Sequence, residues 1–275
     1  MYCKRVANCS FFLFVLRVNS KPHFIYKLNS FLDYKIALRK CLFFDILRLN
    51  KFILINLYKR YYMVNDCVFC RELNGSRDTN FAERYPEIKS RVIFETESLA
   101  AFPCIGQLVC GHFLIVPKSH DCTLAQTQKR LSNFNQELSL ILREVHLILG
   151  FELNDSLIFE HGALGPSDGS CGIYHAHLHV LPSTSKIAAC KLYNFQHKDP
   201  IKNLESLLKN IPVDKPYIFA GNMKEGFYHS QLEEALASQT LRKAIANQIN
   251  NSQWDWRNAN REEYMLSTLK QVGLV

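Results

Sequence analysis

The sequence predicts an α+β domain built on a largely antiparallel sheet that carries one long helix. Short apolar runs typical of strands occur both before and after a single strongly amphipathic segment at residues 128–149. A second run, at residues 174–182, alternates between apolar residues and histidines, as a strand with one buried face does. Strands before and after one long helix indicate this class.

The strand candidates share an apolar or alternating pattern closed by turn residues. They are "RVIFETES" with "LAAFPC", residues 111–117, residues 156–162, residues 174–182 and residues 215–221. Gly111 opens the third run and Pro117 closes it. Pro182 ends the histidine run, since proline cannot donate to a strand ladder.

The long helix is predicted from apolar residues at three- and four-residue intervals, with Gly150 where a helix C′ residue belongs. Those apolar residues are Leu131, Phe134, Leu138, Ile141, Leu142, Val145 and Ile148. We expect a short helix in "DPIKNLESLLKNI" and another around residues 231–250. The loop at residues 162–172 is dense in Gly, Pro, Ser and Asp and leads directly into the histidine run.

The chain divides by composition into a leader at residues 1–62, a catalytic-type domain at 63–182 and a C-terminal extension at 183–275 that packs on it. The leader carries a charge balance of +10 and shows no clean helix or strand period. We interpret it as an upstream extension of the reading frame before Met63, with a targeting segment as the alternative. In either case it is expected to lie outside the fold.

The remaining residues, 63–275, carry a balance of −2, so the overall charge of +8 reflects the leader. A near-neutral domain offers no basic footprint for nucleic acid, and we expect no membrane anchoring. The ten cysteines show no regular framework spacing and suit a reducing compartment, which favours the cytoplasm.

The run "YHAHLHVLP" places His175, His177 and His179 on one side of a strand. One interpretation is an exposed strand face that happens to carry histidines. Imidazole clusters more often mark metal sites or catalytic sites, and we favour these. The residues alone leave open a metal site, a nucleophilic or acid–base site, or both.

A metal site is indicated by "CVFC", which gives Cys67 and Cys70 the spacing of a zinc knuckle. A thioredoxin-like pair would need a neighbouring βαβ unit, which this segment does not show. His120 in "PKSHDCTL" and His175 would complete a Cys₂His₂ set for structural zinc. The alternative is two buried cysteines and an ordinary loop histidine.

The run "HAHLHVL" resembles the signature of the histidine triad (HIT) superfamily of nucleotidyl hydrolases and transferases. The resemblance extends over "FPCIGQLVCGHFLIVPKSH" and "IFEHG", roughly residues 66–182. The Cys67, Cys70, His120 and His175 set also resembles the zinc site of zinc-containing branches, including galactose-1-phosphate uridylyltransferase. The resemblance implies a HIT-like fold and a longer, bacterial-type member of the superfamily, with a homodimer as a possible assembly.

The resemblance implies that His177 attacks a nucleotide α-phosphate and forms a nucleotidyl-histidine intermediate. Its other ring nitrogen would be held by a backbone carbonyl near His175, while His179 would bind phosphate oxygens. His175 would orient the strand by ligating zinc. The substrate-binding candidates are Phe69 and Ile105 in an apolar base slot, Glu160 and His161 as polar contacts, and Ser170, Cys171 and Gly172 near the phosphate.

Three features depart from this pattern or lie outside it. Cys104 stands where well-known members carry an Asp or Asn for the ribose hydroxyls, and a thiol is a poor partner for a diol. Arg242, Lys243 and Arg257 could reach a distal phosphate, but we favour a solvated charged helix face. Trp254 and Trp256 are interpreted as core or interface residues.

Two functions remain in competition. The first is a nucleotidyl hydrolase or transferase that acts on a phosphoanhydride or phosphoramidate bond. The second is a zinc-stabilised nucleotide-binding module without turnover, which Cys104 keeps open.

Overall fold

The computed structural model describes residues 12–18, 21–28, 66–168, 172–197, 199–258 and 262–275. The chain divides into two compact units, Met1–Met63 and Val64–Val275. Within the first unit, strand β1 (Phe12–Val18) pairs antiparallel with β2 (Lys21–Leu28), a hairpin that the sequence did not predict.

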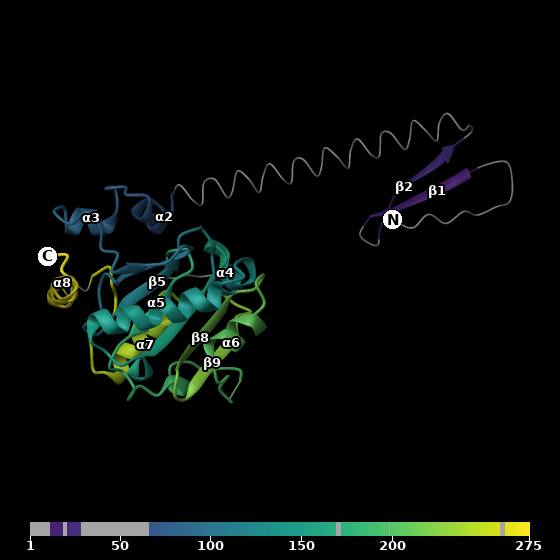
Figure 1. Cartoon of the computed structure of the whole chain (residues 1–275). Coiled ribbons are helices and arrows are strands. Elements are labelled where there is room, and N and C mark those ends of the chain that lie inside the picture. The colour runs from purple at the N-terminus through teal and green to yellow at the C-terminus, as the bar shows by residue number, and fades with distance from the viewer. Residues whose placement is uncertain (1–11, 19–20, 29–65, 169–171, 198, 259–261) are drawn as a thin grey trace. The chain divides into compact units, whose positions relative to one another are not determined.

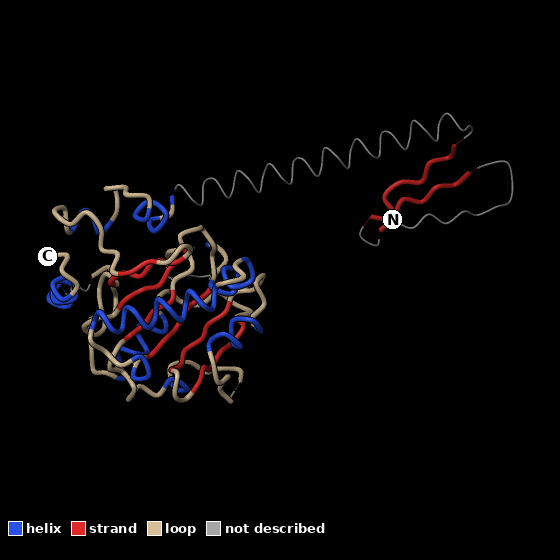
Figure 2. The backbone as a smooth tube through the Cα atoms, in the orientation of Figure 1, coloured by secondary structure: helices blue, strands red, loops and turns tan. Residues whose placement is uncertain are grey.

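A seven-stranded sheet, in the order β3-β4-β5-β7-β6-β8-β9, forms the centre of the second unit, and every neighbouring pair is antiparallel (Figure 2). The α+β class with an antiparallel sheet is confirmed. The strands are β3 (Phe94–Glu95), β4 (Leu99–Pro103), β5 (Phe113–Pro117), β6 (Leu157–Gly162), β7 (Leu178–Leu181), β8 (Tyr217–Asn222) and β9 (Gly226–Gln231).

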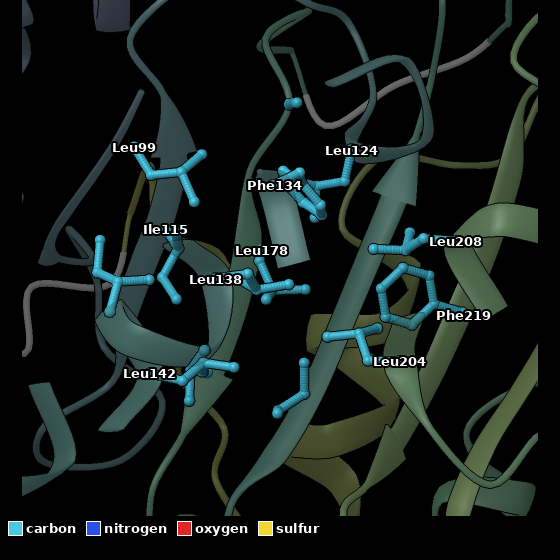
Figure 3. Packing of buried hydrophobic residues seen from close by; sticks show 14 of the residues in the cluster. Leu99, Ile115, Leu124, Phe134, Leu138, Leu142, Leu178, Leu204, Leu208 and Phe219 are labelled. Atoms are coloured by element: carbon cyan, nitrogen blue, oxygen red, sulfur yellow. The ribbon is translucent and has the colours of Figure 1, made fainter. Parts of the chain in front are cut away.

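One face of the sheet is covered by α4 (Leu124–Arg130), α5 (Phe134–Leu149) and α6 (Leu204–Asn210) (Figure 1). Alternate strand residues point toward these helices and make the largest apolar core, as Figure 3 shows for Ile115, Leu178 and Phe219. Ala176, Leu178 and Val180 belong to this core, so the alternation of the histidine run places the histidines on the opposite face.

The opposite face packs against α2 (Val68–Leu73) near β4 and β5, and against α7 (Thr240–Gln248) near β6 and β8. The remaining helices, α3 (Asn80–Arg84) and α8 (Glu262–Gln271), join through a small cluster that contains Phe81 and Leu269. The C-terminal residues therefore supply both a sheet hairpin, β8–β9, and helix α7 above the histidine face.

Three element boundaries differ from the prediction. The helix expected around residues 231–250 begins only at Thr240, as α7, and Gln231 is the last residue of strand β9. The single helix expected over 128–149 is two helices, because α4 ends at Arg130 and α5 begins at Phe134. Helix α5 ends as predicted, with Gly150 in the left-handed region at φ 64°. Strand β7 begins only at Leu178, since the Ala176 N–H donates to the carbonyl of Asp121 at 2.7 Å instead of joining the ladder.

No helix among the described residues is long and apolar enough to cross a membrane.

Candidate active site and metal centre

A pocket lies on the histidine face of the sheet, between α2 on one side and α7 on the other. His177 and His179 line it together with His161 of β6. Apolar side chains make much of the remaining wall: Val68, Phe69, Phe81, Ile105, Leu114, Phe159, Ile173, Leu241 and Trp256. The base-slot candidates Phe69 and Ile105 are thus brought together with the triad histidines.

The His177 ring is held by the backbone of the segment that leads into β7. Its Nδ1 lies 2.6 Å from the backbone carbonyl oxygen of His175, a distance that requires Nδ1 to donate. In the neutral ring this places the proton on Nδ1 and the lone pair on Nε2. Phe69 packs edge-on against His177 with ring centroids 5.7 Å apart, which further fixes the ring.

His179 is oriented by a second buried histidine that the sequence interpretation missed. The Leu108 N–H donates to His112 Nδ1 at 3.3 Å, so neutral His112 carries its proton on Nε2. His112 Nε2 lies 3.0 Å from His179 Nδ1 and donates to it, which leaves the His179 proton on Nε2. Burial lowers the pKa of both rings well below the usual value, so both are neutral near pH 7.

Cys67, Cys70, His120 and His175 form one cluster whose candidate ligand atoms all lie within 4.8 Å of one another. Cys67 Sγ lies 3.3 Å from His175 Nδ1, and Cys70 Sγ lies 3.3 Å from His120 Nδ1. Sulfur and nitrogen atoms that share a tetrahedral zinc ion are about 3.6 Å apart. The donor set and its separations therefore fit a divalent metal of the zinc type.

The surroundings of this cluster support the same fit. His175 Nε2 donates to the carbonyl of Pro117 at 2.8 Å, which turns Nδ1 toward the cysteines. Cys67 is also the N-cap of α2, with its Sγ accepting from the Cys70 N–H at 3.5 Å. Because Phe69 lies between the two cysteines, the cluster also fixes one wall of the pocket.

A second group, Cys104 with His112 and His179, has candidate ligand atoms within 4.8 Å of one another. It does not suit a cation, because the guanidinium Nη1 of Arg242 lies 3.7 Å from Cys104 Sγ. Burial also raises the pKa of the Cys104 thiol, and both ring nitrogens of His112 are already engaged. We therefore treat only the first cluster as a metal site.

Glu160 and His161 do not share the role that the sequence interpretation gave them. As strand neighbours they point to opposite faces. Glu160 lies beneath the sheet, where its carboxylate accepts from the Leu124 N–H at 2.9 Å and from the Tyr217 hydroxyl. Burial raises the pKa of Glu160 to about 7. Glu160 is therefore a buried structural group rather than a substrate contact.

His161 does line the pocket, and its Nε2 is buried without a hydrogen-bond partner among the described residues. Burial, followed by the charge that His177 carries when it is protonated, lowers the pKa of His161 to about 4, so this ring is neutral near pH 7. A neutral imidazole can donate from one nitrogen and accept at the other.

The loop candidates lie partly outside the described residues. Ser170 and Cys171 fall in the segment 169–171 that the structure does not describe. Gly172 is exposed with φ +85°, and a Cβ there would lie 2.9 Å from Arg257 Nη2. The Arg257 guanidinium in the C-terminal segment therefore lies close to Gly172, in the loop before the triad.

The prediction of a solvated charged helix face is correct for Lys243, which is exposed on α7, but not for Arg242. Arg257 is exposed but lies in a turn after α7. Arg242 is 4% exposed and lines the pocket. Trp256 also lines the pocket, with the Arg257 guanidinium 5.2 Å from its ring centroid. Trp254 is half-buried against the apolar cluster that contains α7, as an interface residue would be.

Three proteins named as uncharacterized HIT-like proteins are similar to this chain. The one from Mycoplasma genitalium is 30% identical over 119 residues, which cover 43% of this chain and 73% of that protein. The one from Borreliella burgdorferi is 28% identical over 120 residues, covering 42% and 75%. The one from Methanocaldococcus jannaschii is 28% identical over 117 residues, covering 42% and 78%. No family model matches the chain.

Among solved structures, a Zn-bound histidine triad family protein from Mycobacterium smegmatis is 20% identical, with a TM-score of 0.29, and the match covers 43% of this chain and 76% of that one. A histidine triad protein from Clostridium difficile is 23% identical, with a TM-score of 0.32, covering 42% and 90%. On the sequence relatives, this chain belongs to the HIT-like protein family. The likeness to galactose-1-phosphate uridylyltransferase stays a prediction.

Proposed function

We propose that the protein is a nucleotidyl hydrolase or transferase in which His177 attacks the α-phosphate of a nucleotide. The observation that carries this proposal is the 2.6 Å hydrogen bond from His177 Nδ1 to the His175 carbonyl. It selects the tautomer whose Nε2 has the lone pair a nucleophile needs. The ring lines a pocket whose apolar walls, including Phe69 and Ile105, suit a nucleobase.

In the first step Nε2 of His177 forms a bond to phosphorus, the bond from phosphorus to the leaving group breaks, and the leaving group takes up a proton. The nucleotidyl imidazole keeps its Nδ1 proton and is positively charged, and the His175 carbonyl stabilises that charge. In the second step the oxygen of water, or of another acceptor, bonds to phosphorus as the N–P bond breaks. A nucleoside monophosphate or a nucleotidyl ester leaves, and the acceptor proton is released.

The neighbouring imidazoles would act on the phosphate oxygens. His179 carries its proton on Nε2 because His112 donates to its Nδ1, so it can donate into the pocket. Phe159 stacks on His179 with ring centroids 4.4 Å apart and holds its plane. His161 supplies a further neutral hydrogen-bonding group on the same face.

Zinc is the metal we propose for the cluster of Cys67, Cys70, His120 and His175. Two thiolates and two imidazoles make a closed four-ligand set, which is typical of a structural rather than a catalytic site. Bound there, zinc would supply stability and not the nucleophile. The chain's own contribution is to hold α2, and with it Phe69, beside the triad.

The test compares the full chain with its His177→Ala variant on dinucleoside polyphosphates, adenosine 5′-phosphoramidate and uridine diphosphate sugars. We expect monophosphate release from one of these classes, reduced at least about a thousandfold in the variant. Binding of nucleotides by both proteins without turnover would contradict the proposal and favour the zinc-stabilised binding module. Turnover that persists in His177→Ala would overturn the assignment of the nucleophile.

A further inference from the structure

Arg242 is a buried cation in the pocket wall, where burial lowers its pKa and the charge of Asp255 acts to raise it. Its guanidinium donates to the carbonyl of Gly106 at 2.5 Å and to that of Trp254 at 3.1 Å, and Nη1 lies 3.7 Å from Cys104 Sγ. Among the described residues, no carboxylate forms an ion pair with it.

The Asp255 carboxylate is partly exposed and accepts from Gln239 Nε2 and the Arg257 N–H, so it offsets the buried charge without pairing with it. A ligand that brings a negative charge into the pocket would stabilise the guanidinium further.

The other buried guanidinium of the pocket shows the contrast. Arg91 is held by both carboxylate oxygens of Glu72, at 2.6 and 2.9 Å, and donates to the carbonyl of Pro103. Its charge is therefore balanced within the protein, and Phe102 packs 4.3 Å from the guanidinium carbon. Arg242 has no such bidentate carboxylate, so less of its positive charge is balanced within the protein.

The first turn of α7 reinforces this charge. Gln239, Thr240 and Leu241, at the start of the helix, line the same pocket as Arg242. Backbone N–H groups in the first turn have no partner within their own helix, and the helix dipole is positive at this end. A helix start and a guanidinium that face one cavity together form a site for an anion.

The position of this site differs from that of the phosphate under attack. The rings of His177 and His179 have centroids 5.1 Å apart, and His179 lies in the group with Cys104 whose candidate ligand atoms are within 4.8 Å. Arg242 contacts Cys104, another member of that group. The hydrogen-bond partners of the guanidinium are thus Cys104, Gly106 and Trp254, and not the two histidines that face the phosphate under attack.

We propose that Arg242 and the first turn of α7 bind a second anionic group of the substrate, a phosphate or a carboxylate, while His177 attacks the first. This inference rests on the proposed function and narrows its substrate class to nucleotides that carry two separated anionic groups. The pocket near Cys104 presents donors, so it suits a substrate that offers acceptors there.

The test measures binding of matched ligands to the full-length wild-type protein and to its Arg242→Gln and Arg242→Lys variants. Adenosine 5′-monophosphate is compared with adenosine 2′,5′- and 3′,5′-bisphosphate and with adenosine diphosphate. Adenosine 5′-phosphoramidates of aspartate and of alaninamide distinguish a carboxylate from a neutral group. Lys243→Gln is the matched control, since Lys243 is an exposed cation on the same helix.

We expect at least one doubly anionic ligand to bind wild-type protein about tenfold or more tightly than the monophosphate. Arg242→Gln should remove that advantage and change monophosphate binding less than about twofold, Arg242→Lys should keep part of it, and Lys243→Gln should leave it intact. The proposal would be overturned if Arg242→Gln weakened the binding of all ligands equally. It would also be overturned if the variant still bound the doubly anionic ligand more tightly than the monophosphate by the wild-type factor. Unfolding temperature and zinc content show whether a variant remains folded.

Failure of the proposed function gives a different result. If no nucleotide binds the wild-type protein, inorganic pyrophosphate is tested by thermal stabilisation of the same variants. Stabilisation that depends on Arg242 would retain the anion site and reject nucleotides as the substrate class. No stabilisation would reject both.

Discussion

The carbonyl of His175 accepts a hydrogen bond at 2.6 Å from Nδ1 of His177, while the imidazole of His175 lies 3.3 Å from Cys67 Sγ. One residue therefore belongs both to the candidate metal centre and to the support of the proposed nucleophile. Any change that loosens the metal centre should therefore also loosen the hydrogen bond that positions the His177 ring. The reverse does not follow, because the His177 side chain is not among the candidate ligands.

His175→Ala should therefore lose both zinc and turnover. The carbonyl remains in the variant, but the side chain that fixes its position does not. We expect zinc content to fall from about one per chain toward zero and the unfolding temperature to fall by roughly 10 °C. His177→Ala, by contrast, should keep zinc and stability. Full zinc in His175→Ala, measured by elemental analysis, would show that the cluster is not the metal site.

Metal removal should reproduce part of this effect without any substitution. A chelator that strips the cluster should lower turnover because α2 and His175 are no longer held together, and added zinc should restore it. The measurement follows activity and zinc content through removal and reloading. Full activity in the metal-free protein would separate the two sites and contradict the coupling.

His112 is a positioning residue in this account. His112→Met removes the donor to His179 Nδ1 and should lower kcat about 10- to 100-fold with little change in KM. His112→Gln keeps a donor and should recover part of kcat. The control is His146→Gln, which alters a buried histidine on the helical face of the sheet, bonded to Leu142 and Ser156. Equal kcat values for His112→Met and His112→Gln would argue that His112 only fills space.

Glu160 predicts a pH dependence of stability. Burial raises the pKa of its carboxyl from 4.5 to about 7 in the folded protein. Because the pKa is raised in the folded protein, the contribution of Glu160 to the free energy of unfolding is fully present below pH 4.5 and is lost as the pH rises to about 7. The loss is of the order of 3 kcal/mol. Glu160→Gln should flatten the free energy of unfolding over that interval, measured by denaturant titration.

The exposed Glu87→Gln is the control for this experiment and should leave the pH dependence unchanged. The prediction is that Glu160 makes the free energy of unfolding fall between pH 4.5 and 7. It would be contradicted if the wild-type free energy of unfolding instead rose over this interval and Glu160→Gln abolished the rise.

The sequence predicted the sheet and its apolar face because apolar residues alternate along the chain even where the backbone forms no strand hydrogen bonds. Residues 174–177 keep the alternation but leave the strand, since Ala176 bonds to the Asp121 loop. The helix break at residues 131–133 was hidden because Leu131 and Phe134 both keep the apolar spacing. The spacing of apolar residues indicates which face of an element is buried. It does not indicate where the backbone hydrogen bonds of that element end.

Site residues were predictable where local spacing fixes them and not where distant segments meet. The Cys67–Cys70 spacing and the triad alternation pointed to two groups that the structure brings together. Strand alternation alone could have shown that Glu160 and His161 face opposite ways. Arg242 approaches Cys104 across 138 positions of sequence, and no local pattern marks such a contact.

Covalent attack by His177 would leave a nucleotidyl-histidine intermediate that can be trapped. Wild-type protein and His177→Ala are mixed with the best substrate of the panel in a single turnover, quenched in alkaline denaturant and weighed intact. The account predicts that the wild-type mass rises by one nucleotidyl group, mapped to His177, and that His177→Ala shows no such adduct. Turnover by the wild-type protein with no adduct at any time, or an adduct that persists in His177→Ala, would contradict it.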